Sequence, residues 1–190
     1  MAYENGEPKD IPDSEREVFK TKGGRPVLDG GGVTPDVKLD AFEPSEILQS
    51  LDENNWIFKY VNKYIKDNPG APGMTDLSFD KYADFTSFVK KGGFTYDREV
   101  ETALSNLLEK AKNSDELQSE VQAIKSKVDK DKADDLQEFK DEITKRIEIE
   151  LAQRYHFQEG KAFQRLKNDP EIDEAIKLLG DPQRYKKLLQ

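Results

Sequence analysis

The stretch from Phe19 to Leu39 reads FKTKGGRPVLDGGGVTPDVKL and has the most specific residue order in the 190-residue chain. Strand-forming residues on both sides of Gly23 and Gly24 predict a β-hairpin, because glycine readily adopts the positive φ angles of tight turns. The glycine triplet that follows, and the Pro-Asp pair after it, predict further sharp turns. This short β-hairpin precedes a long segment whose apolar residues recur at helical spacing.

The glycine triplet, residues 30–32, raises the question of a phosphate-binding loop. Such a loop follows a strand, opens a helix and carries Lys, Ser or Thr at a fixed offset, so that backbone N–H groups at the helix start hold the phosphate. The triplet is not followed by a helical pattern or by a Lys-Ser or Lys-Thr pair at the required offset. We therefore interpret the triplet as a structural turn.

The same stretch resembles a motif of the carboxy-terminal processing peptidases, also called tail-specific proteases. In that family a pattern close to F-x-T-x-x-GR-x-V-x-x-GGG-[IV]-x-PD forms the last strands of the protease core. The positions that match it here are Phe19, Thr21, Gly24, Arg25, Val27, Gly30, Gly31, Gly32, Val33, Pro35 and Asp36. The rest of the chain, from FEPSEILQSL to NDPEIDEAIKLLGDP, looks like the helical C-terminal extension of family members of the Bacteroidetes type.

The resemblance implies an enzyme that this chain alone does not contain. Family members cleave proteins at their C-termini with a Ser nucleophile and a Lys base, and the Ser lies in a G-x-[ST]-[AS]-[SG]-E segment that is missing here. A serine hydroxyl is a weak nucleophile unless a base activates it. We expect a non-catalytic C-terminal part of a larger serine peptidase, with no catalytic residue and no cofactor of its own.

The same resemblance implies a location and partners. The parent enzyme would work in the cell envelope, in the periplasm, and reach protein substrates through a PDZ module. The partners expected for this chain are the rest of the protease core and further copies of itself.

Composition limits the other functions. The net charge of −9 and the pI of about 4.9 argue against nucleic-acid binding, because no basic stripe is available to displace counterions from phosphates. No apolar run approaches the roughly 20 residues that cross a bilayer. Without cysteine, and with His156 as the single histidine, the sequence offers neither thiolate nor paired histidine ligands for a metal.

We expect a mainly α fold, with residues 1–40 as the end of the protease core and residues 41–190 as an elongated multi-helix domain. The segments with apolar residues at helical spacing begin with Pro44 at an N1-like position, at Trp56, after an N-cap at Ser78, at Thr95 or Asp97, after Ser114 and at Leu136. Asp169 with Pro170, and Asp181 with Pro182, predict the N-cap and first residue of two short terminal helices. Between Lys125 and Asp135 the stripe falters. A turn capped by Asp131 and a continuous helix both fit, and the turn is favoured.

Five aromatic residues of the second and third helical segments have two interpretations: Trp56, Tyr60, Tyr64, Phe85 and Phe88. They form a hydrophobic core, or they provide a groove that binds a peptide. The second interpretation belongs to an alternative function, a free-standing acidic helical adaptor or holdase. The a/d-like seam of Leu117, Val121, Ile124 and Val128 must also be buried against something, which predicts self-association.

Overall fold

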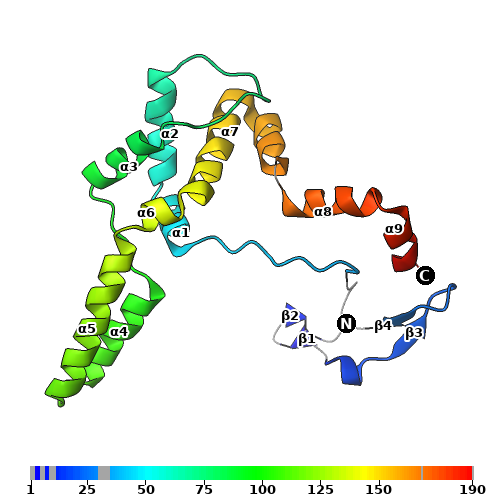
Figure 1. The fold of residues 1–190 in the computed structure, drawn as a ribbon, viewed down its shortest axis with the longest axis horizontal. Coiled ribbons are helices and arrows are strands. Elements are labelled where there is room, and N and C mark those ends of the chain that lie inside the picture. Colours follow the sequence, from blue (N-terminus) through cyan, green and yellow to red (C-terminus); the bar gives the residue numbers. More distant parts are fainter. Residues whose placement is uncertain (1–2, 5–6, 9–11, 30–34, 168, 190) are drawn as a thin grey trace. The chain divides into compact units, whose positions relative to one another are not determined.

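The computed structural model describes residues 3–4, 7–8, 12–29, 35–167 and 169–189 (Figure 1). In this part of the chain the fold is mainly helical with a short two-stranded antiparallel hairpin near the N-terminus, as the sequence predicts, and it contains nine α-helices. Contacts divide the chain into two compact units, one of residues 42–167 and one of residues 1–41 with 168–190. The assignment of residues 1–40 to a protease core, and the elongated shape, stay predictions.

The smaller unit contains two short strand pairs and two helices. Strands β1 (Tyr3–Glu4) and β2 (Glu7–Pro8) are antiparallel, as are β3 (Val18–Lys20) and β4 (Pro26–Leu28). A 3₁₀ turn at Asp13–Glu15 lies between the two pairs. Gly24 has a φ of +88° in the turn between β3 and β4, which explains why a residue without Cβ stands there.

Helices α8 (Pro170–Leu179) and α9 (Pro182–Leu188) both begin as the sequence predicts. In each helix an Asp side chain, Asp169 or Asp181, accepts hydrogen bonds from two backbone N–H groups of the first turn, and proline occupies the first helical position.

The larger unit consists of seven helices joined by short turns and one longer loop. In chain order they are α1 (Glu46–Glu53), α2 (Trp56–Asp67), α3 (Tyr82–Lys91), α4 (Glu99–Lys110), α5 (Asp115–Lys132), α6 (Asp135–Glu138) and α7 (Lys140–Leu166). Figure 1 shows α4 and α5 side by side as a helical hairpin.

The hydrophobic core of the larger unit is formed by α1, α2, α3, the loop before α3, and α7. The phenol ring of Tyr60 lies at its centre, with ring centroids 5.1 Å from Phe85, 5.5 Å from Phe88 and 5.8 Å from Phe79. Ile143, Ile147 and Leu151 of α7 complete it, each at most 2% exposed. No residue of α4 or α5 belongs to this core.

Helix α7 reverses direction within its bounds. His156 and Phe157 have non-helical backbone angles, and Phe157 has a φ of +54°, which is rare for a bulky side chain. After this point the chain folds back, as Figure 1 shows, and Gly160 packs against the Ala152 carbonyl and the His156 Cβ. A side chain at position 160 would meet these atoms, so the close approach requires glycine.

Several predicted helix starts are wrong. The third helix begins at Tyr82 and not after Ser78, because the Phe79 N–H donates to Glu148 of α7 over 2.9 Å and holds this segment outside the helix. The fourth begins at Glu99, after both predicted starts. The first begins after Ser45, whose Oγ accepts the Leu48 N–H, so the preceding proline lies outside the helix.

The favoured turn between the fifth and sixth segments is present at residues 133–134, between α5 and α6. Asp131 does not cap it and lies inside α5. The turn places Asp135, the first residue of α6, in a buried ion pair with Arg98.

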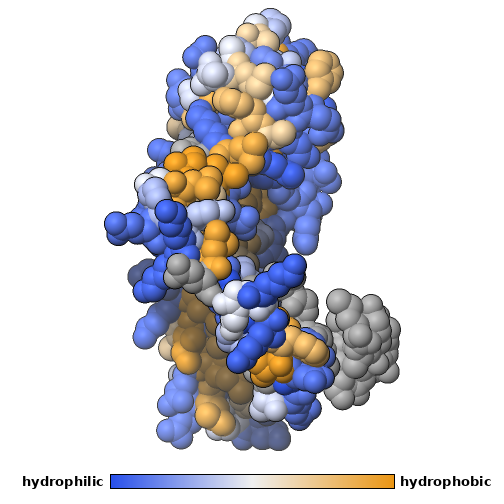
Figure 2. Space-filling view, turned by 90° about the vertical axis from the view of Figure 1, so that its right-hand side faces the viewer, coloured by the Kyte–Doolittle hydropathy of each residue, from blue (hydrophilic) through white to orange (hydrophobic). Residues whose placement is uncertain are grey.

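The surface of the molecule is mostly hydrophilic with hydrophobic side chains at several places, as Figure 2 shows for one face. Among the described residues, none of the helices is long and apolar enough to span a membrane.

Candidate functional site

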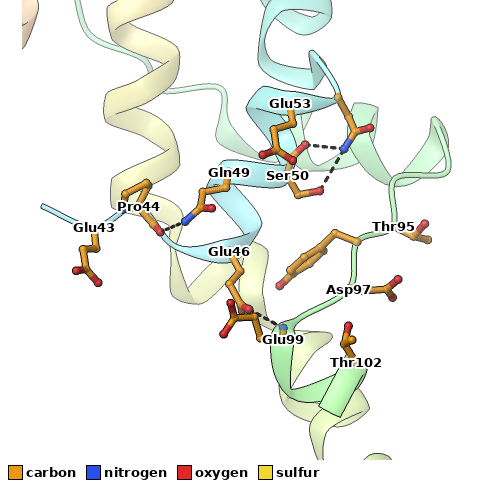
Figure 3. Close-up of a pocket in the computed structure, with 12 residues that line it drawn as sticks. Glu43, Pro44, Glu46, Gln49, Ser50, Glu53, Thr95, Asp97, Glu99 and Thr102 are labelled. Atoms are coloured by element: carbon orange, nitrogen blue, oxygen red, sulfur yellow. Dashed lines mark hydrogen bonds between the residues drawn. The ribbon is translucent and has the colours of Figure 1, made fainter. Parts of the chain in front are cut away.

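A groove of the larger unit lies between α1 and the segment that connects α3 to α4 (Figure 3). Its volume is about 780 Å³. The residues that line it are Glu43, Pro44, Glu46, Gln49, Ser50, Glu53, Asn54, Thr95, Tyr96, Asp97, Glu99 and Thr102. No lysine, arginine or histidine occurs among these lining residues.

The polar groups of this groove bond to one another. The Glu46 carboxylate accepts the Glu99 N–H at 2.7 Å and so joins α1 to the start of α4. The amide of Asn54 donates to the backbone carbonyl and the hydroxyl of Ser50, at 2.9 and 3.3 Å. Ser50 has no histidine or lysine among the groove residues that could remove its proton, so the arrangement has no activated nucleophile.

A buried ion pair lies next to the groove, where the α4–α5 hairpin meets the rest of the unit. Asp135, 1% exposed, accepts two hydrogen bonds from the Arg98 guanidinium, and the Nε–Oδ2 distance is 3.0 Å. The hydroxyl of Tyr96 donates to the same carboxylate. Hydrogen bonding to Asp135 raises the pKa of Arg98, and burial followed by the Asp135 contact raises the pKa of Tyr96.

A second ion pair extends this cluster. The Lys132 ammonium lies 2.6 Å from Glu101 and 4.7 Å from the centroid of the Tyr96 ring. Burial opposes ionisation of Glu101, but the Arg98 N–H at 2.8 Å and the Lys132 ammonium outweigh it and lower the pKa of this carboxyl. We call Tyr96, Arg98, Glu101, Lys132 and Asp135 the junction cluster. It joins the start of α4 to the end of α5 and to α6 at the base of the hairpin, and Tyr96 also packs against the aromatic core.

The five aromatic residues predicted as core or as a binding groove pack on one another. Tyr60 and Phe85 are fully buried, and Trp56, Tyr64 and Phe88 are partly buried against the same core. The Trp56 indole meets Phe88 and Phe94 edge to face, each with ring centroids 5.9 Å apart. The structure therefore accounts for these rings as packing elements, and partner binding through them stays a prediction.

The residues of the protease-like motif gather at one turn of the smaller unit. The Arg25 N–H donates to the Thr21 hydroxyl at 3.1 Å, and the Arg25 side chain pairs with Asp36 and donates to the Leu188 carbonyl at 2.9 Å. Hydrogen bonding to Arg25 lowers the pKa of Asp36. Phe19 and Val27 face each other across β3 and β4. The motif residues Gly30, Gly31, Gly32 and Val33 lie outside the described residues, and Pro35 follows them.

Sequence reasoning missed the junction cluster. Arg98 and Asp135 are 37 positions apart, and both stand in segments rich in charge, so no spacing marks them. The one available signal was the faltering apolar stripe before Leu136, which indicates a turn but not the ion pair behind it. In the part of the chain that the structure describes, no group of three or more His, Cys, Asp or Glu side chains could hold a metal ion.

Comparison with known proteins gives one family. A family model described as "Probable PDZ-protease, C-terminal helical domain" matches residues 47–179. Neither a search of curated proteins nor a search of solved structures returned a match. The matched region contains the aromatic core, the junction cluster and α8.

Proposed function

The chain belongs to the family of C-terminal helical domains of probable PDZ-proteases, and from this membership we propose that it is the non-catalytic C-terminal region of a tail-specific serine endopeptidase of the Bacteroidetes type. The parent enzyme degrades or processes proteins at their C-termini in the periplasm. This region supports the enzyme by packing on its core, by oligomerisation or by docking partners.

The observation that carries this proposal is the β3–β4 hairpin. It holds the motif residues that match the end of the protease core, yet all six of its strand residues are exposed. Val18 is 58%, Phe19 50% and Val27 41% exposed, although apolar strand residues of this kind are normally buried on at least one face of a sheet. An isolated two-stranded hairpin is marginally stable and leaves two open edges. Strands of the protease core would pair with these open edges and cover the exposed apolar side chains.

The experiment is an immunoblot of fractionated source cells with an antibody raised against this chain. The proposal expects a band well above 21.7 kDa in the envelope fraction. Protein immunopurified from that band should degrade a test protein that carries an unstructured apolar C-terminal tail, and should spare the same protein without the tail. A band at 21.7 kDa without degrading activity would contradict the proposal and favour the adaptor or holdase.

A substitution in the hairpin tests the role of the exposed strands. Phe19→Asp should lower the activity of the purified larger form by roughly tenfold or more, because a charge would replace an apolar contact with the core. Lys22→Asp, in the turn that joins the strands, is the matched control and should leave activity within about twofold. Equal activity of the two variants would show that the hairpin does not pack on the core.

A further inference from the structure

Helices α4 and α5 each carry an apolar stripe with the same 4-3-4 spacing. On α4 it consists of Val100, Leu104 and Leu107 with the C-cap residue Ala111, and on α5 of Leu117, Val121, Ile124 and Val128. This spacing is typical of helices that pack in coiled coils and bundles, where residues a and d face the neighbouring helix.

Only half of each stripe is used within the hairpin. Leu104, Ala111 and Val121 are buried at 4–7% exposure and Val128 is half-buried, since α4 packs against α5. The other residues remain exposed, and we call them the open stripe: Val100 at 43%, Leu107 at 48%, Leu117 at 51% and Ile124 at 47%.

The open stripe lies on one face of the hairpin. On an α-helix, residues seven positions apart point within about 20° of each other. On both α4 and α5, the exposed pair is rotated about the helix axis by about 40° from the buried pair, in the same sense. The same offset on two antiparallel helices places both pairs on the same face. A hollow of about 410 Å³ at the hairpin base confirms the geometry, because Val100 and Asp131 line it together and Asp131 stands seven residues after Ile124.

The opposite face of the hairpin is polar. Its exposed residues are Ser105 and Glu109 on α4 and Ser119, Gln122 and Ser126 on α5. The hairpin is therefore amphipathic, and the exposed apolar side chains are concentrated on one side of it.

We propose that the open stripe binds the same face of a second copy of this chain, so that two α4–α5 hairpins form a four-helix bundle. In such a bundle each helix contacts two neighbours. The buried half of each stripe contacts the other helix of the same hairpin, and the exposed half would contact a helix of the second copy. A two-fold interface must be self-complementary. The open stripe meets this requirement because each of its helices contributes two branched aliphatic residues at the same spacing.

The charges beside the stripe fix the orientation. Lys110 on α4 and Glu120 on α5 flank the open stripe near the tip of the hairpin, on the side away from the buried seam. When α4 of one copy lies over α5 of the other with the tips together, each Lys110 faces a Glu120 of the partner copy. A second copy of the chain therefore supplies an opposite charge for both Lys110 and Glu120.

The proposed dimer specifies how this region could oligomerise, and it rests on the proposed function only through that oligomerisation role. Its failure would leave the peptidase assignment standing, since the immunoblot and the tail-degradation assay test that assignment without reference to the dimer.

Sedimentation of the 190-residue chain across the micromolar range tests the proposal. A dimer is expected, and Leu107→Glu with Ile124→Glu should weaken its dissociation constant by on the order of 100-fold or more. The matched control is Ser105→Glu with Ser119→Glu, which adds the same charges to the polar face and should leave the dimer unchanged. A wild-type monomer at all concentrations, or a dimer that the first pair of substitutions does not weaken, would overturn the proposal.

A charge exchange tests the orientation with variants that leave the apolar residues intact. Lys110→Glu and Glu120→Lys should each weaken the dimer, by roughly two- to fivefold, and the double variant should restore it. If the losses of dimer affinity in the two single variants simply add in the double variant, the arrangement with both tips at the same end is wrong. Circular dichroism of each variant shows whether the helices are retained.

Discussion

The aromatic core and the α4–α5 hairpin belong to one compact unit but are stabilised in different ways. The core surrounds Tyr60 with side chains from four helices, several of them completely buried. The hairpin has one narrow seam with three buried apolar residues, Leu104, Ala111 and Val121, and its base is held by the junction cluster. Hydrophobic burial thus stabilises the first region, and partly buried ion pairs hold the base of the second together.

Because of this difference, the stability of the aromatic core and that of the α4–α5 hairpin should respond differently to solution conditions and to a binding partner. The free energy of apolar burial depends on area and has no titrating group, whereas ion pairs depend on pH and are screened by salt. A hairpin with a narrow seam and an exposed apolar stripe gains stability when a partner covers the stripe. If the proposed dimer forms, the aromatic core folds without the partner and the hairpin gains stability from it.

The largest effect is expected from truncation of the aromatic core. Phe85→Ala should lower the free energy of unfolding by about 3–5 kcal/mol, because Phe85 is fully buried and contacts Tyr60 and Tyr82. Phe58→Ala is the matched control, since Phe58 is 45% exposed, and should cost about 1 kcal/mol or less. Urea unfolding followed by the fluorescence of Trp56, the single tryptophan, measures both. Equal losses would refute the assignment of the core.

The next effect separates the two regions. Asp135→Asn leaves the Arg98 guanidinium without its charged partner and should destabilise the hairpin base by about 3 kcal/mol. The hairpin should then unfold before the core, so that helicity by circular dichroism is lost at lower urea than Trp56 fluorescence changes.

Asp129→Asn, on the exposed surface of α5, is the control and should leave the two transitions coincident. Replacement of both partners, Arg98→Met with Asp135→Leu, should recover most of the loss, because neither member of this pair is then left as an unpaired charge. Coincident transitions in Asp135→Asn would mean that hairpin and core are one cooperative region.

A third substitution examines the turn in α7. Gly160→Ala should destabilise the core by about 1–3 kcal/mol, because the new methyl group would press on the Ala152 carbonyl where the chain folds back. Gly70→Ala has open space around it and should change stability by about 0.5 kcal/mol or less. If Gly160→Ala were the more stable protein, α7 would not fold back at this point.

The smallest effect concerns pH. The folded-state pKa of Glu101 lies below its unfolded value, so its contribution is fully present above the ordinary glutamate pKa of about 4.3 and is lost as the pH falls below it. Thermal unfolding of the wild type should lose slightly more stability between pH 6 and pH 3 than that of Glu101→Gln. Glu109→Gln, exposed beside Lys112, should retain the wild-type profile. Identical profiles for all three proteins would contradict the role of Glu101.

Local signals in the sequence predicted what local contacts determine. The β3–β4 hairpin, the α8 and α9 caps and the existence of the helices all depend on residues a few positions apart. The start of α3 was mispredicted because Glu148, 69 positions away, holds the Phe79 N–H. A hydrogen bond across that separation leaves no trace in a periodic pattern.

The candidate interaction sites were likewise predicted only where local spacing determines them. The seam of α5 was predicted to need a partner, and the structure shows that α4 covers Val121 but not Leu117 and Ile124. The turn in α7 was missed because the helical spacing continues through Phe157, and only Gly160, inside an otherwise regular pattern, gave a hint. Tertiary contacts decide such positions, and they override local preference.

Hydrogen exchange of the chain at low and high protein concentration distinguishes a core that folds alone from a hairpin that a second copy stabilises. Slow exchange is expected in α1, α2, α3 and α7 at both concentrations. In α4 and α5, exchange should be fast at low concentration and slower at high concentration, because the open stripe is then covered. Uniform protection of all helices at both concentrations would contradict the division into a self-sufficient core and a hairpin completed by a second copy.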